Sequence, residues 1–272
     1  MPTLAPKLAD RGGHLSDTRR FVLVHCVIFT NAARASASGG RMTHFKRLVC
    51  LANSRKGGER CVAGMVVDSQ QWIRPVSARI NHEISRQERQ YTDGSDPRVL
   101  DIIDVPLLHH QPSSYQSENW LLDPRRHWKR SGRAEWNQLL TAEQRPSSLW
   151  TNGHSTPGRL NDRIPIEEAV TLPDSLRLVR VSRVTLRLHP PNASSDAAKR
   201  PMDAVFRHAG RLYIMRVTDP EYELAYRNKP GKVHELGESF LTVSLGEEFK
   251  GYAYKLAAAI IERAKIEAGS KT

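Results

Sequence analysis

Proline and glycine interrupt this chain so often that they favour many short strands over a few long helices. Of the 272 residues, 16 are proline and 17 are glycine. Proline removes a backbone donor and glycine favours turns, so both end regular elements. Hydrophobic residues make up 39% of the chain, which suffices for a packed core. The sequence therefore predicts a folded, mainly β protein with some helix.

The clearest strand pattern lies in the second half of the chain. Val184, Leu186 and Leu188 alternate with polar residues and would point inward. Ala209-Gly210 lies between two strand-like segments and predicts a tight hairpin. Apolar residues repeat every four positions from Tyr252, which predicts a terminal helix over residues 249–268. Further strands are expected at residues 46–52, 60–67, 72–77, 99–108, 118–122, 176–188, 203–208, 211–218 and 240–245, and short helices at 81–90 and 133–142.

Changes in composition divide the chain. Residues 1–41 are rich in Ala, Gly, Ser and Arg, whereas a buried-strand pattern begins soon after Met42. We therefore predict that residues 1–41 are a disordered extension or lie outside the natural gene product, which would start at Met42. Residues 145–173 are dense in Pro, Gly, Ser and Asn and predict a linker. The expected modules are two small β-barrels, at residues 42–165 and 170–272, the second carrying the terminal helix.

The charge of the chain points to a polyanionic partner. The 41 Lys and Arg residues against 29 Asp and Glu give a net charge of +12. Nucleic acid is the first candidate and a membrane surface the second. No membrane span is expected, because the longest apolar run, residues 21–29, falls well short of the roughly 20 residues needed. Three cysteines without CxxC spacing predict neither a disulfide framework nor a zinc site, and favour a reducing, cytoplasmic location.

The strongest local feature is a basic segment around one indole. Phosphate contacts need cations, and unpaired bases need flat apolar surfaces on which to stack. Residues 125–133 offer both, so they predict a nucleic-acid-binding site. The alternative is a solvated loop whose tryptophan packs into the core between the modules. The candidate residues are Arg125, Arg126, Trp128, Lys129 and Arg130.

Two further segments could hold a nucleic-acid ligand. Residues 53–59 predict a polar hairpin loop, in which Arg55, Lys56 and the following Arg60 surround two glycines that let backbone N–H groups approach a phosphate. The alternative is an ordinary hairpin turn. Trp72 and Arg74 would share one strand face and could stack a base or bind a phosphate. Equally, Trp72 could fill the barrel, and the proline that follows Arg74 predicts an edge strand or a strand end.

Other charged residues carry weaker signals. Arginines 177, 180, 183 and 187 could form a basic face on the second module, or simply a solvated strand face. Asp101 and Asp104 lie three apart and would point to opposite faces of a strand. His109-His110 would do the same, and Cys50 and Cys61 lie in apolar strand contexts typical of core thiols. No catalytic, metal-binding or cofactor motif is present, so neither catalytic residues nor a cofactor are predicted.

Several segments together carry a family resemblance. They are CLANSRK (50–56), RCVAG (60–64), WIRPVS (72–77), LDII (100–103), PL (106–107), QSENW (116–120) and YKLAAAII (254–261). The set resembles the bacterial dual-OB-domain-containing proteins, over essentially all of residues 46–262. The resemblance implies two tandem OB-like barrels, no established catalytic activity, and a place in bacterial conflict or mobile-element (defence) systems with a nucleic-acid or nucleotide-sensing role. It assigns no ligand residues.

The function expected from the sequence is therefore non-catalytic binding of single-stranded or structured nucleic acid. One alternative is a sensor of a small nucleotide or modified base, bound between the modules. Another is a metal-dependent nuclease that uses Asp101 or Asp104, and a third is a protein–protein adaptor. A partner protein encoded by a neighbouring gene is also possible in such a system.

Overall fold

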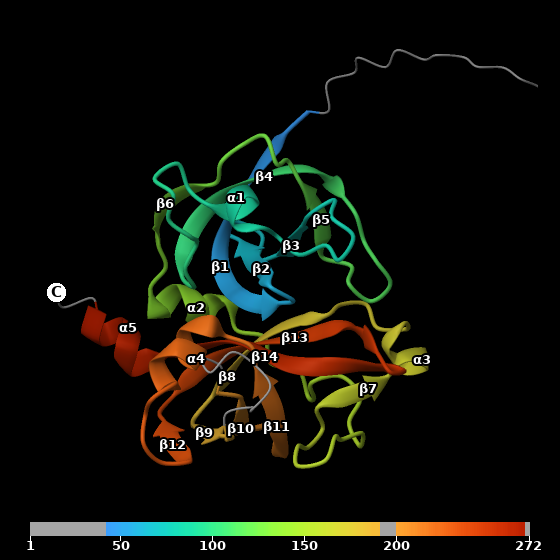
Figure 1. Ribbon diagram of the computed structural model, residues 1–272, viewed down its shortest axis with the longest axis vertical. Helices are drawn as coiled ribbons and strands as arrows, with labels where there is room; N and C mark the ends of the chain where they lie inside the picture. Colours follow the sequence, from blue (N-terminus) through green and yellow to red (C-terminus); the bar gives the residue numbers. More distant parts are fainter. Residues whose placement is uncertain (1–41, 191–199, 270–272) are drawn as a thin grey trace, which may run out of the picture. The chain divides into compact units, whose positions relative to one another are not determined.

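Two β-sheets, each built from its own stretch of chain, form the part of the protein that the computed structural model describes (Figure 1). The described residues are 42–190 and 200–269. The predicted N-terminal extension, residues 1–41, lies outside them. The segment Arg41–Thr272 forms one compact unit, so contacts between the two sheets belong to a single body. The mainly β fold expected from the sequence is confirmed.

The first sheet closes into a five-stranded barrel with the strand order of an OB fold. Its strands follow the order β1-β2-β3-β5-β4, and β1 also pairs with β4. Strands β3 and β5 run parallel, and β6 extends the sheet beyond β4. The strands are β1 (His44–Lys56), β2 (Glu59–Val66), β3 (Trp72–Val76), β4 (Asp101–His110), β5 (Asn119–Leu122) and β6 (Lys129–Arg133), and the helices are α1 (Arg86–Arg89) and α2 (Trp136–Ala142).

The second sheet repeats this arrangement. Its order is β12-β9-β10-β11-β14-β13-β8. Because only Ser182 and Arg183 separate β8 from β9, the two can be traced as one bent strand, and the order then matches that of the first barrel. Strands β11 and β14 are the parallel pair. The elements are β7 (Arg163–Pro165), α3 (Ile166–Ala169), β8 (Leu176–Val181), β9 (Val184–Leu188), β10 (Met202–His208), β11 (Arg211–Val217), α4 (Pro220–Tyr226), β12 (Val233–Leu236), β13 (Ser239–Phe249), β14 (Tyr252–Glu262) and α5 (Arg263–Gly269).

Two turns show how local chemistry sets the strand register. Ala209 and Gly210 both have positive φ and join β10 to β11, which confirms the predicted hairpin. The predicted loop at residues 53–59 is wrong in length. Pairing continues to Lys56↔Glu59, so the turn contains only Gly57 and Gly58. The polar residues on either side of the turn belong to the paired strands and are buried or half-buried, whereas Gly57 and Gly58 at the tip are exposed.

The predicted terminal helix over residues 249–268 is wrong for most of its length. Residues 252–262 form β14, which pairs with β13, β11 and β7, and only Arg263–Gly269 is helical. A spacing of four residues places side chains on one face of a strand as well as of a helix. Residues 257–261 are all buried, as is typical of a central strand with both faces covered. Tertiary pairing therefore overrides the apparent helical period.

The predicted linker at residues 145–173 is also folded. Leu149, Trp150 and Ile164 are buried in the core of the second barrel, and Trp150 Nε1 donates to Asp174 Oδ1 at 2.9 Å. Proline and glycine here shape turns of an ordered segment instead of a loose connection. The module boundaries at residues 165 and 170 stay a prediction.

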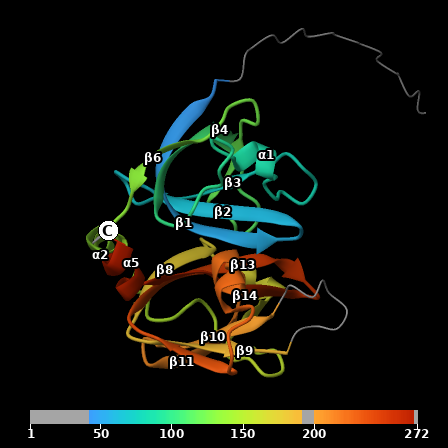
Figure 2. The same ribbon diagram turned by 60° about the vertical axis from the view of Figure 1, so that its left-hand side comes forward.

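A shared apolar layer joins the barrels. It includes Met65 and Trp72 from the first sheet and Leu178, Phe240 and Ala258 from the second. Figure 2 shows the β1–β2 hairpin lying against β13 and β14. Thr242 Oγ1 donates across the same boundary to the backbone oxygen of Leu51 at 2.6 Å. Within the described residues no helix has the length and hydrophobicity needed to cross a bilayer.

Candidate nucleic-acid interface

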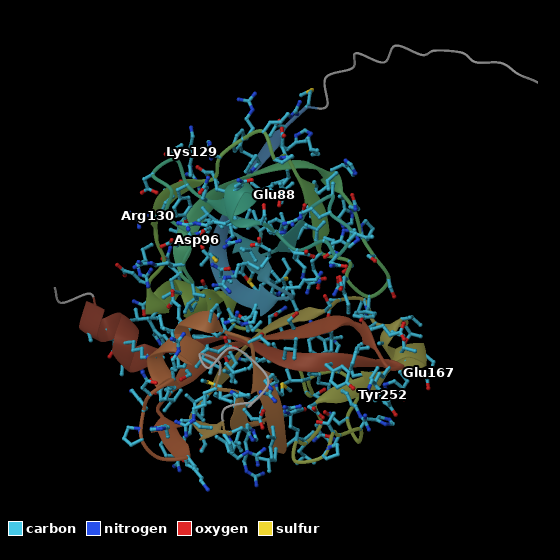
Figure 3. The ribbon with its side chains drawn as sticks, in the orientation of Figure 1. Glu88, Asp96, Lys129, Arg130, Glu167 and Tyr252 are labelled. Atoms are coloured by element: carbon cyan, nitrogen blue, oxygen red, sulfur yellow. The ribbon has the colours of Figure 1, made fainter. Side chains whose placement is uncertain are left out.

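The basic segment forms a turn and then the edge strand β6. Its cations Arg125, Arg126, Lys129 and Arg130 are all exposed, and Figure 3 shows Lys129 and Arg130 at the outer margin of the first barrel. Arg125 is ion-paired with Asp123 (Nε to Oδ1, 2.8 Å), and this bond lowers the pKa of the Asp123 carboxyl. The other three make no ion pair with the residues described. They are thus available for phosphate.

Trp128 does not share this exposure. Its side chain is fully buried in the core of the first barrel, together with Leu48 and Ile103. No hydrogen-bond partner of its indole nitrogen lies among the described residues. A base cannot stack on a ring without exposed surface, so the structure favours a structural role for Trp128. The ring packs in the core of the first barrel, however, and not between the modules as that alternative predicted.

The hairpin cations face the second barrel. Arg55 is paired with Glu223 (Nε to Oε2, 2.9 Å) and Lys56 with Glu247 (Nζ to Oε1, 2.6 Å). Arg60 is half-buried, and its pKa is lowered by burial and by the nearby charges of Arg89 and Arg55. Arg55 and Lys56 thus help to fix the barrels together and do not form the free phosphate loop that the sequence predicts.

Trp72 and Arg74 share one face of β3, as predicted. Trp72 is 7% exposed and donates to Gln144 Oε1 at 3.1 Å, which fits its structural alternative. Arg74 is 3% exposed, although it carries a permanent charge. The proline after Arg74 lies beyond Gly64↔Ile73, the last residue pair between β2 and β3. This position near the end of β3 agrees with the predicted strand end. β3 as a whole is an interior strand, because β5 pairs with its other edge.

Arg55, Lys56 and Arg74, which the sequence assigns to two separate candidate sites, line a single cavity of about 270 Å³. The β1–β2 hairpin and β3 form one wall, and β13 and β14 form the other. In OB folds, ligands bind on the face of strands two and three and on the bordering loops. Here that face of the first barrel is covered by the second, and the cavity lies between them.

Sequence reasoning missed an exposed aromatic residue on the β1–β4–β6 face, the outer surface of these three strands. Phe45 is 50% exposed and lies opposite Pro106 on β4. Arg47 comes two residues after Phe45 on β1 and lies opposite Asp104 on β4. On its other side, Asp104 lies opposite Lys129 on β6. An aromatic ring and cations therefore share neighbouring strands. The sequence does contain a signal for this exposed face: Phe45, Arg47 and Val49 are spaced two residues apart, just before the buried part of the strand.

The arginines of the second barrel are largely paired. Arg177 contacts Asp174, Arg180 contacts Glu143 and Glu238, and Arg187 contacts Asp203. Arg183 alone of the four is exposed without an ion pair to a described residue. The alternation of β9 is confirmed, since Val184, Leu186 and Leu188 are buried. This surface matches the solvated-face alternative better than a binding site.

The carboxylates proposed for catalysis hold the fold together. Asp101 is 2% exposed and accepts from Tyr91 Oη and from the backbone nitrogen of Arg98, both at 2.9 Å. Asp104 accepts from Arg47 and Ser131, and the Arg47 bond lowers the pKa of its carboxyl. Among residues 42–190 and 200–269, no three His, Cys, Asp or Glu side chains gather as a metal site.

Two successive barrels with the same OB strand order define a tandem OB-fold protein. The family model described as the dual OB-containing domain matches residues 46–260, and the chain belongs to this family. The family resemblance seen in the sequence is thereby confirmed. No curated protein and no solved structure gives a significant match, so the residues of a functional site have to be argued from this chain.

Proposed function

We propose that the protein binds single-stranded nucleic acid through the β1–β4–β6 face and catalyses no reaction on it. The observation that carries the proposal is the exposed ring of Phe45 on the same sheet surface as Lys129, a cation that makes no ion pair with a described residue. Base stacking needs the ring, and phosphate neutralisation needs the cation. Phe45 thus takes the role that the sequence prediction gave to Trp128.

Charge on and beside this face favours a polyanion. From residue 123 to residue 133 the chain has five cations, and Asp123 is the single acid. Among the described residues no strand pairs with the outer edge of β6, the last strand of its sheet. The backbone of a nucleic-acid strand can therefore run along this edge. A single strand offers unstacked bases to an aromatic side chain, whereas a duplex hides them. Single-stranded DNA or RNA is therefore preferred over duplex in this proposal.

The test is fluorescence anisotropy of the full chain with short single-stranded DNA, single-stranded RNA and duplex. Phe45→Ala should weaken single-strand binding by about 1–3 kcal/mol for each stacked base. Phe249→Ala is the matched control, because Phe249 is 59% exposed but lies on the second barrel. Equal losses in both variants, or no binding to any oligonucleotide, would contradict the proposal.

The cellular setting belongs to the same proposal. A bacterial, cytoplasmic protein of a conflict or mobile-element system is consistent with the family and with the free thiols of Cys50 and Cys61. A partner encoded by a neighbouring gene would be sought by co-expression and co-purification. A chain that is recovered only in a secreted fraction would contradict this setting.

A further inference from the structure

The cavity between the barrels is a separate place where a ligand could bind. Its volume of about 270 Å³ lies just below the usual range for small-molecule pockets, roughly 300–1,000 Å³. Val76, Leu245 and Leu256 give it apolar surface, and Gln116 and Tyr254 give it polar groups. This combination suits a compact ligand with one flat apolar part, and it excludes a long strand.

Arg74 is the unusual member of the cavity wall. Its guanidinium donates to two neutral oxygens, Asn119 Oδ1 and Ser244 Oγ, each at 3.2 Å. No carboxylate of a described residue forms an ion pair with it. The backbone N–H of Arg74 does bond to Glu118, but the carboxylate of Glu118 accepts from the backbone and hydroxyl of Ser175 instead. A buried cation without a counter-charge is costly unless something else supplies that charge.

The second barrel provides an internal comparison. Arg216 holds the position equivalent to Arg74. In each barrel the arginine is the first residue of the third strand (β3 or β11) that pairs with the parallel fifth strand (β5 or β14). Opposite Arg216 on β10 lies Asp203, a buried carboxylate 3.7 Å from Arg216 Nε. In the first barrel the register Gly64↔Ile73 brings Ala63 opposite Arg74. The first barrel thus has the arginine but lacks the carboxylate.

The acid that lines the cavity does not fill this gap, because Glu247 is paired with Lys56. The lining residue Arg55 is paired with Glu223, which does not itself line the cavity. These two pairs cancel, so the net charge left at the cavity is that of Arg74.

We propose that this cavity binds the phosphate of one nucleotide-sized ligand, with Arg74 as its cationic partner and the apolar wall against the base. The shared chemistry is a phosphate monoester joined to a flat ring, either in a free nucleotide or at the phosphorylated end of a strand. The site does not depend on the β1–β4–β6 face, and each can fail without the other.

Thermal unfolding of the full chain, with and without added ligand, tests the proposal. The probes are inorganic phosphate, the nucleoside 5′-monophosphates, the matching nucleosides, and a trinucleotide with and without a 5′-phosphate. Ligands with both phosphate and base should raise Tm, and nucleosides should not. Stabilisation by monophosphates alone assigns a free nucleotide, and stabilisation by the phosphorylated trinucleotide assigns a strand end. If no phosphate-containing probe raises Tm, the proposal is overturned.

Two variants locate the binding. Arg74→Met should weaken the ligand roughly 10- to 100-fold, the range expected for a lost charged hydrogen bond, and should leave Tm without ligand equal or higher because an uncompensated charge is removed. Gly246→Val fills cavity space while keeping Arg74, since a Cβ there meets Leu256 at an ordinary 3.5 Å. Gly237→Val, at an open surface position, is the control. Ligand shifts that persist in Gly246→Val and in folded Arg74→Met would overturn the proposal.

Discussion

Replacing Trp128 with alanine is expected to lower the free energy of unfolding by about 3–5 kcal/mol, the usual cost of truncating a fully buried large aromatic residue. The side chain is 0% exposed and packs against Ile103 and Leu107 in the core of the first barrel. Few other positions leave a larger void when truncated. Urea unfolding followed by circular dichroism measures the effect, and a loss below about 1 kcal/mol would show that the ring is not a core anchor.

The same residue separates a structural role from a stacking role. Trp128→Phe keeps an apolar ring in the core and should cost less stability than Trp128→Ala. Because the ring does not reach the surface, Trp128→Phe should bind single-stranded oligonucleotides as the unaltered protein does. A selective loss of binding in a stable Trp128→Phe variant would return the stacking role to this tryptophan.

Raising the pH from 7 to 10 is expected to stabilise the protein through Lys255 by about 3 kcal/mol. Lys255 is 1% exposed inside the second barrel, where its ammonium group donates to the backbone oxygen of Thr151 and to Asn152 Oδ1. Burial lowers its pKa from 10.5 to about 7, and the charge of Asp162 opposes that shift only in part. Between these two pKa values the unfolded chain binds more protons than the folded chain, so stability rises with pH.

Lys255→Met provides the reference for this effect, because cysteines and tyrosines also titrate in that range. The free energy of unfolding of the unaltered protein minus that of the variant should increase steadily between pH 7 and 10. Urea unfolding at several pH values measures this difference. A constant difference would mean that Lys255 stays charged in the folded protein.

The sequence predicted the strands well where the pattern belongs to one strand alone. The alternation of Val184, Leu186 and Leu188 and the turn at Ala209-Gly210 depend on neighbours in the chain. The prediction from sequence failed over residues 249–268, because apolar side chains that repeat every four residues fit both a strand and a helix. The choice between them is made by β11 and β13, which pair with β14 from elsewhere in the chain.

The sequence predicted which residue types contribute to the candidate site, but not which way their side chains point. The chain identifies Arg126, Lys129 and Arg130 as surface cations, but no local pattern shows that Trp128 points inward and Phe45 outward. The role proposed for Arg74 depends on Ala63, instead of a carboxylate, lying opposite it on β2, and on coverage by β13 and β14. Both are properties of the assembled barrels, which is why sequence reasoning paired Arg74 with Trp72 instead of with Arg55 and Lys56.

The most direct test of the central claim is the salt dependence of single-strand binding by the full chain. Two variants that each remove two charges would be compared with the unaltered protein: Lys129→Ala/Arg130→Ala on β6, and Arg183→Ala/Arg211→Ala on the second barrel. If Lys129 and Arg130 each neutralise one phosphate, the slope of log affinity against log salt should fall in magnitude by about 1.4 in the first variant. The second variant should keep the slope of the unaltered protein. An unchanged slope in the first variant, or the same decrease in both, would contradict binding along β6.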